Sequence, residues 1–195
     1  MFWTQRPSAS DEFFISSHAN PRLRRLLAQQ LRSSSQSGIE QLSWLFWLLR
    51  TRQPKRLLID GRLEPAMALM TAAAVSLGRA GRIQHSAGPL PPDISSALTS
   101  AGLDWVWLHA PLPPQATERY DALVLVSPTE EMKQRLFEWT PHLSAGALII
   151  GMDSSAGRNR SPAVYSELLS SETGLESLIL APAATPLLTM IWRGH

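Results

Sequence analysis

The polar residues that could bind a ligand or catalyse a reaction stand at the ends of short apolar runs in this sequence. Asp60, Gly61 and Glu64 follow one such run, while His85 ends a second and Ser127 ends a third. Side chains of these types can hold the polar groups of a ligand, and an imidazole can act as a general base. Because open α/β sheets bind ligands at the carboxyl ends of their strands, we predict a ligand-binding edge made by these residues.

Each of these residues also has a structural interpretation, which the sequence leaves open. Asp60 or Glu64 could cap the next helix in an ordinary strand-to-helix turn. His85 could be a hydrogen-bonded residue without a chemical role. Ser127 opens the pattern Ser-Pro-Thr-Glu over residues 127–130, which is typical of a capping box with proline at the first helical position.

The residue types that are missing exclude several kinds of chemistry. The chain has no cysteine, which excludes a disulfide framework, a thiolate zinc site and a cysteine nucleophile. Its five histidines show no metal-ligand spacing, and the sequence contains neither a GxSxG elbow nor a phosphate-binding loop of the P-loop type. The sequence therefore identifies no catalytic residue.

Apolar runs and amphipathic stretches alternate from residue 55 onward, which predicts a parallel sheet with helices on its faces. The expected strands are residues 55–60, 81–85, 104–109, 121–126 and 146–150, followed by a closing antiparallel pair over 175–181 and 187–192. The expected helices between them are residues 64–79, 93–100, 128–142 and 162–172. The predicted fold class is a three-layer, doubly wound α/β domain.

Two further helices precede the sheet, over residues 21–32 and 39–50. The second is apolar nearly all round, which indicates burial on more than one side. Trp44 and Trp47 lie off its main apolar face, where they could belong to the core or contact a second subunit in a homodimer. We expect an N-terminal arm over residues 1–19 and one domain over 20–195, with the N-terminal helices in 20–50 and the sheet in 55–193.

Charge is unevenly distributed, although the net charge is only +2. Residues 1–62 carry ten lysines or arginines against four acids, and the remainder carries eight against twelve. The solvated face of the first helix accounts for Arg22, Arg24, Arg25 and Arg32, so we do not expect nucleic acid as a partner. No signal peptide is recognisable, and the apolar run 44–49 is far shorter than the ~20 residues that cross a bilayer. We expect a cytoplasmic protein without a membrane span.

Residues 38–193 resemble the class I S-adenosylmethionine (SAM)-dependent O-methyltransferases of the caffeoyl-CoA and catechol type, mainly in the order and spacing of the elements. Residues 55–61 look like the strand and turn that hold the methionine part of the cofactor. Residues 81–83, 120–126 and 143–150 look like the second, fourth and fifth strands. The resemblance implies a Rossmann-like, mostly parallel, seven-stranded sheet with an antiparallel last strand, and often a homodimer.

Several positions that the resemblance assigns to the cofactor carry other residues here. Of the glycines in the cofactor turn only Gly61 remains, and Pro65 stands where the second glycine is expected. The family holds the two ribose hydroxyls with a carboxylate at the end of the second strand, where this chain has Gln84, His85 and Ser86. These side chains could bind a ribose without charge assistance.

The metal positions differ as well. The family binds a divalent metal through oxygen ligands at the ends of the fourth and fifth strands. Val126 stands at the first of these positions, and either Met152 or Asp153 stands at the second. Because one carboxylate does not make a magnesium site, no metal is expected.

We therefore expect a methyltransferase-like protein with eroded SAM and metal motifs. It would be non-catalytic or altered in ligand binding, and would act as a scaffold or regulatory partner of another protein. The alternative is an active, metal-independent, SAM-dependent methyltransferase that acts on a small molecule. SAM is accordingly the candidate cofactor, at Asp60, Gly61, Glu64, His85 and Ser127.

Overall fold

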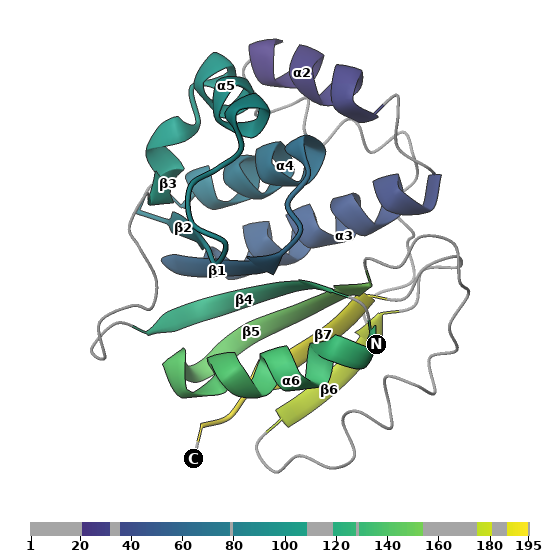
Figure 1. Cartoon of the computed structure of the whole chain (residues 1–195), viewed down its shortest axis with the longest axis vertical. Helices are drawn as coiled ribbons and strands as arrows, with labels where there is room; N and C mark the ends of the chain where they lie inside the picture. Colours follow the sequence, from purple (N-terminus) through teal and green to yellow (C-terminus); the bar gives the residue numbers. More distant parts are fainter. Residues whose placement is uncertain are drawn as a thin grey trace.

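The computed structural model describes residues 21–31, 36–78, 80–108, 119–127, 129–153, 175–180 and 187–194. Seven strands within these ranges form one sheet (Figure 1), namely β1 (Arg56–Gly61), β2 (Arg82–His85), β3 (Trp107–Leu108), β4 (Tyr120–Ser127), β5 (Leu143–Asp153), β6 (Leu175–Leu180) and β7 (Leu187–Trp192). Their order across the sheet is β3-β2-β1-β4-β5-β7-β6. Strands β1 to β5 are parallel, whereas β7 is antiparallel to both β5 and β6. The predicted fold class is confirmed, including the antiparallel pair at its end.

Helices cover both faces of this sheet (Figure 1). On one face lie α3 (Gln36–Arg52), α4 (Pro65–Ser76) and α5 (Pro92–Ala101), and on the other lies α6 (Thr129–Trp139). The amphipathic α2 (Pro21–Leu31) packs on α4 and α5 and forms an outer layer. Helix α4 contacts three other helices as well as β2, which explains why it is apolar all round. Within the described ranges, no helix has the length and apolar character needed to cross a bilayer.

The central strands carry side chains into two separate cores. Because successive residues of a strand point to opposite faces, Leu57 and Ile59 enter the larger core beneath α3, α4 and α5. Leu58 enters the smaller core, which includes residues of α6. The same alternation directs Asp60, at the carboxyl end of β1, toward the face that α6 covers.

The third predicted strand is shorter than expected. Its first residues form a 3-10 helix over Asp104–Val106, and only Trp107–Leu108 pair with β2. A strand at the edge of a sheet has a neighbour on one side only, so fewer backbone bonds hold its ends in the extended form. The predicted strand over 104–109 was therefore wrong in its first half.

The fifth strand is longer than expected and irregular near its beginning. It starts at Leu143, and its pairing with β4 changes register between Tyr120 and Ala122. Gly146, which was predicted as the first residue of this strand, has φ +81° in the irregular part. The predicted helix 162–172 and the arm 1–19 lie outside the described residues.

Asp121 joins the beginnings of β1 and β4. Its Oδ2 accepts a hydrogen bond of 2.8 Å from the amide of Lys55, and its Oδ1 accepts one of 2.9 Å from the amide of Arg56. We expect Asp121→Ala to lower the free energy of unfolding by about 2 kcal/mol, because two amides lose a charged acceptor. Thermal unfolding would show this as a Tm about 4–8 °C lower.

Asp104→Ala is the matched control for this prediction, because Asp104 is an exposed carboxylate in the 3-10 helix near the same edge. We expect this variant to stay within about 0.5 kcal/mol of the unchanged protein. Equal losses in the two variants would contradict a specific role for Asp121.

Candidate functional site

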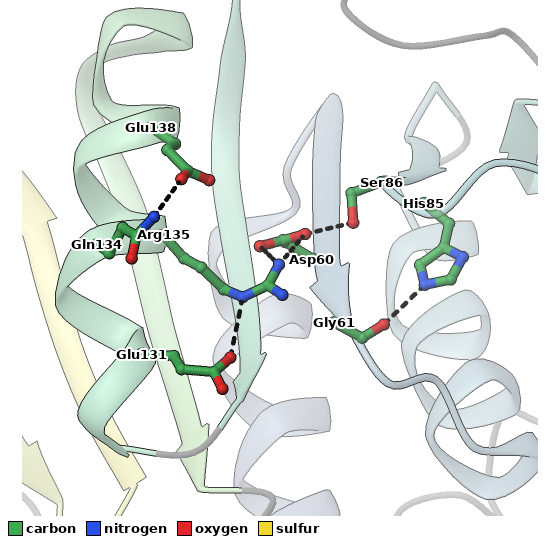
Figure 2. Close-up of polar contacts among 8 residues, drawn as sticks. All are labelled: Asp60, Gly61, His85, Ser86, Glu131, Gln134, Arg135 and Glu138. Carbon is green, nitrogen blue, oxygen red and sulfur yellow. Dashed lines mark hydrogen bonds and ion pairs between the residues drawn. The ribbon is translucent and has the colours of Figure 1, made fainter.

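The carboxylate of Asp60 is the buried charge of the candidate site, with a side chain that is 4% exposed. Figure 2 shows Arg135 reaching it from α6, with Nη1 3.0 Å from Oδ2 and 3.2 Å from Oδ1. From the other side, the hydroxyl of Ser86 donates a hydrogen bond to Oδ1. The Asp60 carboxylate therefore links the ends of β1 and β2 to α6.

Arg135 comes from the buried side of α6, between the core residues Met132 and Leu136. Its Nε lies 3.8 Å from the exposed carboxylate of Glu131, one helical turn earlier. Hydrogen bonding to Asp60 raises the pKa of Arg135 above its ordinary value, and the charges of the nearby carboxylates add to this effect while partial burial opposes it. The guanidinium therefore stays protonated, and Asp60 keeps a permanent cation beside it.

His85 lies at the end of β2 on the opposite face from Asp60, and its ring contacts the turn after β1. Its Nε2 is 2.9 Å from the carbonyl oxygen of Gly61 (Figure 2). A carbonyl oxygen can only accept, so Nε2 carries a proton, and in the tautomer protonated only at Nε2 the other nitrogen, Nδ1, is an acceptor. This Nδ1 is buried and has no hydrogen-bond partner among the described residues. A donor supplied by a ligand would satisfy it.

Gly61 brings the turn after β1 close to the end of β4. The residue has φ +111°, and a Cβ added to it would lie 1.9 Å from the carbonyl oxygen of Val126. That carbonyl also lies 3.4 Å from the amide nitrogen of Arg62, in a backbone hydrogen bond. Only glycine fits at this position, so the one glycine that remains of the cofactor turn is required by the fold itself.

The structure brings three of the five predicted site residues together, namely Asp60, Gly61 and His85. Glu64 is exposed, and it lies 3.9 Å from Arg62 at the surface. Ser127 is the last residue of β4 and pairs with Asp153 in the sheet, while its side chain lies outside the described residues.

The capping interpretation of Asp60 and Glu64 was wrong. Glu64 occupies the N-cap position of α4 but makes no side-chain capping bond, and Pro65 begins the helix. Asp60 binds Arg135 and Ser86 instead. For Ser127 the capping contacts lie outside the described side chains, although α6 begins at Thr129, close to the expected start.

The sequence analysis missed Arg135. A signal was available, because Arg135 follows Met132 by three residues and therefore falls on the apolar stripe of its helix. A charge on such a stripe predicts a buried acidic partner. The sequence did not indicate which acid, since Asp60 lies 75 positions earlier.

The resemblance places the first metal position at Val126 and the second at either Met152 or Asp153, and the side chain of Asp153 lies outside the described residues. Val126 and Met152 are paired in register across these strands. Val126 packs against the larger core, and Met152 is buried within it. Neither side chain offers the oxygen ligand that magnesium requires. The described residues contain no group of three histidine or carboxylate side chains arranged to hold a metal ion.

The same fold occurs in solved methyltransferase structures. The O-methyltransferase TomG from Streptomyces achromogenes, in complex with SAM, is similar to this chain with a TM-score of 0.66 and 16% identity over 100% of both chains. The O-methyltransferase from Bacillus cereus, in complex with SAH, has a TM-score of 0.64 and 16% identity, covering 95% of this chain and 97% of the other. A methyltransferase from Geobacter sulfurreducens has a TM-score of 0.61 and 17% identity over 97% and 98%.

These similarities establish that the chain has the class I methyltransferase fold. At 16–17% identity they concern the fold alone. No protein-family model and no curated protein matches the sequence.

Proposed function

We propose that this chain is a methyltransferase-like protein with altered ligand recognition that serves as a scaffold or regulatory partner. The observation that carries the proposal is the pairing of polar groups at the carboxyl ends of β1 and β2. The Asp60 carboxylate is buried and already accepts hydrogen bonds from Arg135 and Ser86, so a ligand would have to compete with these partners for it. Among the described residues at this edge, Nδ1 of His85 is a buried acceptor without a hydrogen-bond partner.

SAM or a related nucleoside is the ligand class that we propose for this edge. Two of the structurally similar methyltransferases were solved with SAM or SAH bound. A ribose hydroxyl is a donor that an imidazole nitrogen can accept, and burial strengthens such a bond. A bound SAM would supply a methyl group on a sulfonium. In this chain, Nδ1 of His85 would accept a hydrogen bond from a ligand hydroxyl.

Metal-assisted methyl transfer does not form part of the proposal. Val126, at the first of the implied metal positions, packs with the core, and so does Met152, one of the two candidates for the second position beside Asp153. Replacing them with carboxylates would place charges against apolar neighbours. This observation favours a scaffold over an enzyme that activates a hydroxyl group through magnesium.

An active, metal-independent methyltransferase is the second candidate. Nδ1 of His85 has no hydrogen-bond partner within the described part of the chain, which favours this candidate, since an imidazole nitrogen beside a bound acceptor could also remove a proton. The two candidates differ in turnover. An enzyme would convert SAM to S-adenosylhomocysteine in the presence of acceptor phenols or amines, whereas a scaffold would bind the ligand unchanged.

Thermal unfolding with S-adenosylhomocysteine tests the ligand site. At about a hundred times its Kd, a ligand adds ~2.7 kcal/mol of stability, which corresponds to a Tm rise of roughly 5–10 °C for a chain of this size. We expect a saturable rise for the unchanged protein and none for His85→Leu, because leucine offers no acceptor.

His142→Leu is the matched control, because His142 lies near the end of α6, where its ring contacts Trp139 at a centroid distance of 5.9 Å. The His142→Leu variant should show the full rise in Tm with S-adenosylhomocysteine. An equal rise in both variants would remove His85 from the site, and the absence of any rise at millimolar ligand would leave the chain as a scaffold without this cofactor.

The remaining expectations about assembly and location stay predictions. Trp44 packs partly against the larger core, so part of its apolar surface is accounted for within one subunit. The ring of Trp47 lies 5.9 Å from the guanidinium carbon of Arg50. We therefore propose four properties on the sequence analysis alone. These are a homodimer through these helices, an additional protein partner, a single domain over 20–195 and a cytoplasmic location.

A further inference from the structure

The edge of the sheet opposite the candidate site gathers basic side chains from distant parts of the sequence. Strands β1, β2, β4 and β5 begin there, and the antiparallel β7 ends there. We call this group the basic rim, and its members are Arg52, Lys55, Arg56, Arg82, Arg119 and Arg193.

Backbone pairing places the first half of the basic rim. Arg56 on β1 pairs in register with Arg82 on β2. The amide of Arg82 also donates a 2.9 Å hydrogen bond to the carbonyl of Lys55. These three cations therefore lie at the beginnings of two adjacent strands.

Side-chain contacts and strand pairing locate the other members of the basic rim. Arg119, directly before β4, donates a 3.1 Å hydrogen bond to the carbonyl of Leu143, where β5 begins. Arg52, at the end of α3, donates one of 2.8 Å to the carbonyl of Gly146. Arg193 follows β7, whose Trp192 pairs with Ala147 of β5. The basic rim thus crosses five neighbouring strands, in the order β2, β1, β4, β5 and β7.

Acidic groups are fewer than basic ones among the side chains described at this edge. Among the described side chains, those near it are Asp104, Asp121 and Glu138. Asp121 accepts hydrogen bonds from the amides of Lys55 and Arg56, and Glu138 accepts one from Gln134. Counting only the side chains that the structure describes, the balance of charge at the basic rim is positive, whereas Asp60, Glu64 and Glu131 lie toward the opposite edge.

An exposed aromatic ring extends the basic rim. Trp105 is 45% exposed, and the guanidinium carbon of Arg82 lies 5.3 Å from the centroid of its ring. A large indole held at the surface by a cation, next to further cations, is the combination that binds unpaired bases and the phosphates between them.

We propose that the basic rim binds single-stranded nucleic acid, with phosphates on the arginines and a base stacked on Trp105. Neighbouring strands are about 4.8 Å apart, so five strands carry the cations along a line of roughly 19 Å, which suits an extended polyanion. Five of the six cations are arginines, whose fork of donors matches phosphate. This surface is separate from the ligand edge, and the proposal does not depend on the proposed function.

An anionic membrane fits the same surface less well. Membrane-binding faces place several apolar side chains on one side. Besides Trp105, the exposed large apolar residues among those described are Leu77 and Phe137. Leu77 follows α4 and Phe137 lies on α6, and these helices cover opposite faces of the sheet (Figure 1). Leu77, Trp105 and Phe137 thus belong to three different elements and do not form the continuous apolar face of one helix.

Fluorescence anisotropy with labelled oligouridine tests the proposal. If about four cations contact phosphates, the logarithm of the affinity should fall against the logarithm of salt concentration with a slope of about −3. We expect Lys55→Glu/Arg119→Glu to weaken binding at least about tenfold and to flatten this slope. Trp105→Ala should weaken binding by about tenfold without changing the slope.

The matched control is Arg22→Glu/Arg25→Glu, which makes the same change in net charge on α2, away from the basic rim. It should change the affinity less than about threefold at equal salt. Circular dichroism melts would confirm that each variant is folded. If Lys55→Glu/Arg119→Glu does not fold, the affinity of Trp105→Ala and the salt slope of the unchanged protein test the proposal instead.

Three results would overturn the proposal. The first is no binding of oligouridine at low salt, and the second is an equal loss in the rim and control variants. The third is binding to phosphatidylserine-containing vesicles without binding to oligouridine, which would identify the basic rim as a membrane surface.

Discussion

Replacing Gly61 with alanine is expected to lower the free energy of unfolding by about 3 kcal/mol or more. The new Cβ would lie 1.9 Å from the carbonyl oxygen of Val126 and 2.8 Å from its carbonyl carbon. Alanine also strains the backbone at φ +111°. Because both contacts are to backbone, no rotamer change can relieve them. Thermal unfolding should show a Tm roughly 6–12 °C lower.

The variant Gly88→Ala separates the steric contact from the backbone strain as causes of the lost stability. Gly88 has φ +89°, but a Cβ there would meet no atom within 4 Å. We expect this variant to lose only about 1 kcal/mol, the cost of the backbone conformation. Equal losses at the two positions would mean that β4 moves aside, and the close contact would then not define the turn.

Removing the cation of the buried ion pair should have the second largest effect. Arg135→Gln leaves the Asp60 carboxylate buried with the Ser86 hydroxyl as its remaining side-chain partner. Breaking a fully buried pair costs about 3–5 kcal/mol. The side chain of Arg135 is 37% exposed, so solvent screening reduces the expected loss to roughly 2–3 kcal/mol. Chemical denaturation at neutral pH would measure it.

Two further variants make this prediction specific. Glu131→Gln removes only an exposed partner of Arg135, 3.8 Å away, and should change the stability by less than about 0.5 kcal/mol. Asp60→Asn/Arg135→Gln removes both charges and should be more stable than the sum of the single effects predicts. Strict additivity would show that the two side chains are not coupled.

The sequence predicted the layout of the sheet better than the contacts at its edge. Strands β1 and β4 were recognisable because strands covered on both faces are apolar throughout. The closing pair was recognisable because residues 181–186 are too few for a crossover. Both signals lie within short stretches of the sequence, so they can be recognised without knowledge of the fold.

The pairings at the site depend on distant residues, and no local pattern encodes them. Asp60 and His85 were selected because strand ends in open sheets bind ligands, and the structure brings them to the same edge. Nε2 of His85 faces the carbonyl of Gly61 because of the register of β1 on β2. Residue types alone do not specify this register. The contact between Asp60 and Arg135 likewise requires the position of α6.

The grouping of charged side chains on the surface also depends on the fold. Counting lysines and arginines along the sequence assigns the basic character to the N-terminal third, and to the helix over 21–32 in particular. The fold sorts the cations by strand direction instead, so residues as distant as Lys55 and Arg193 come to one edge. A pattern of this kind appears only once the topology is known.

The position of β7 bears on how the chain is made in the cell. β7 follows β6 in the chain, yet it lies between β5 and β6, and β6 is bound to the sheet through it. As the ribosome releases the polypeptide, β6 emerges before the strand that will hold it. Until β7 arrives, the edge of β5 stays open to pairing with other nascent chains. The sheet can therefore be completed only after β7 has been synthesised, and β6 can join it only then.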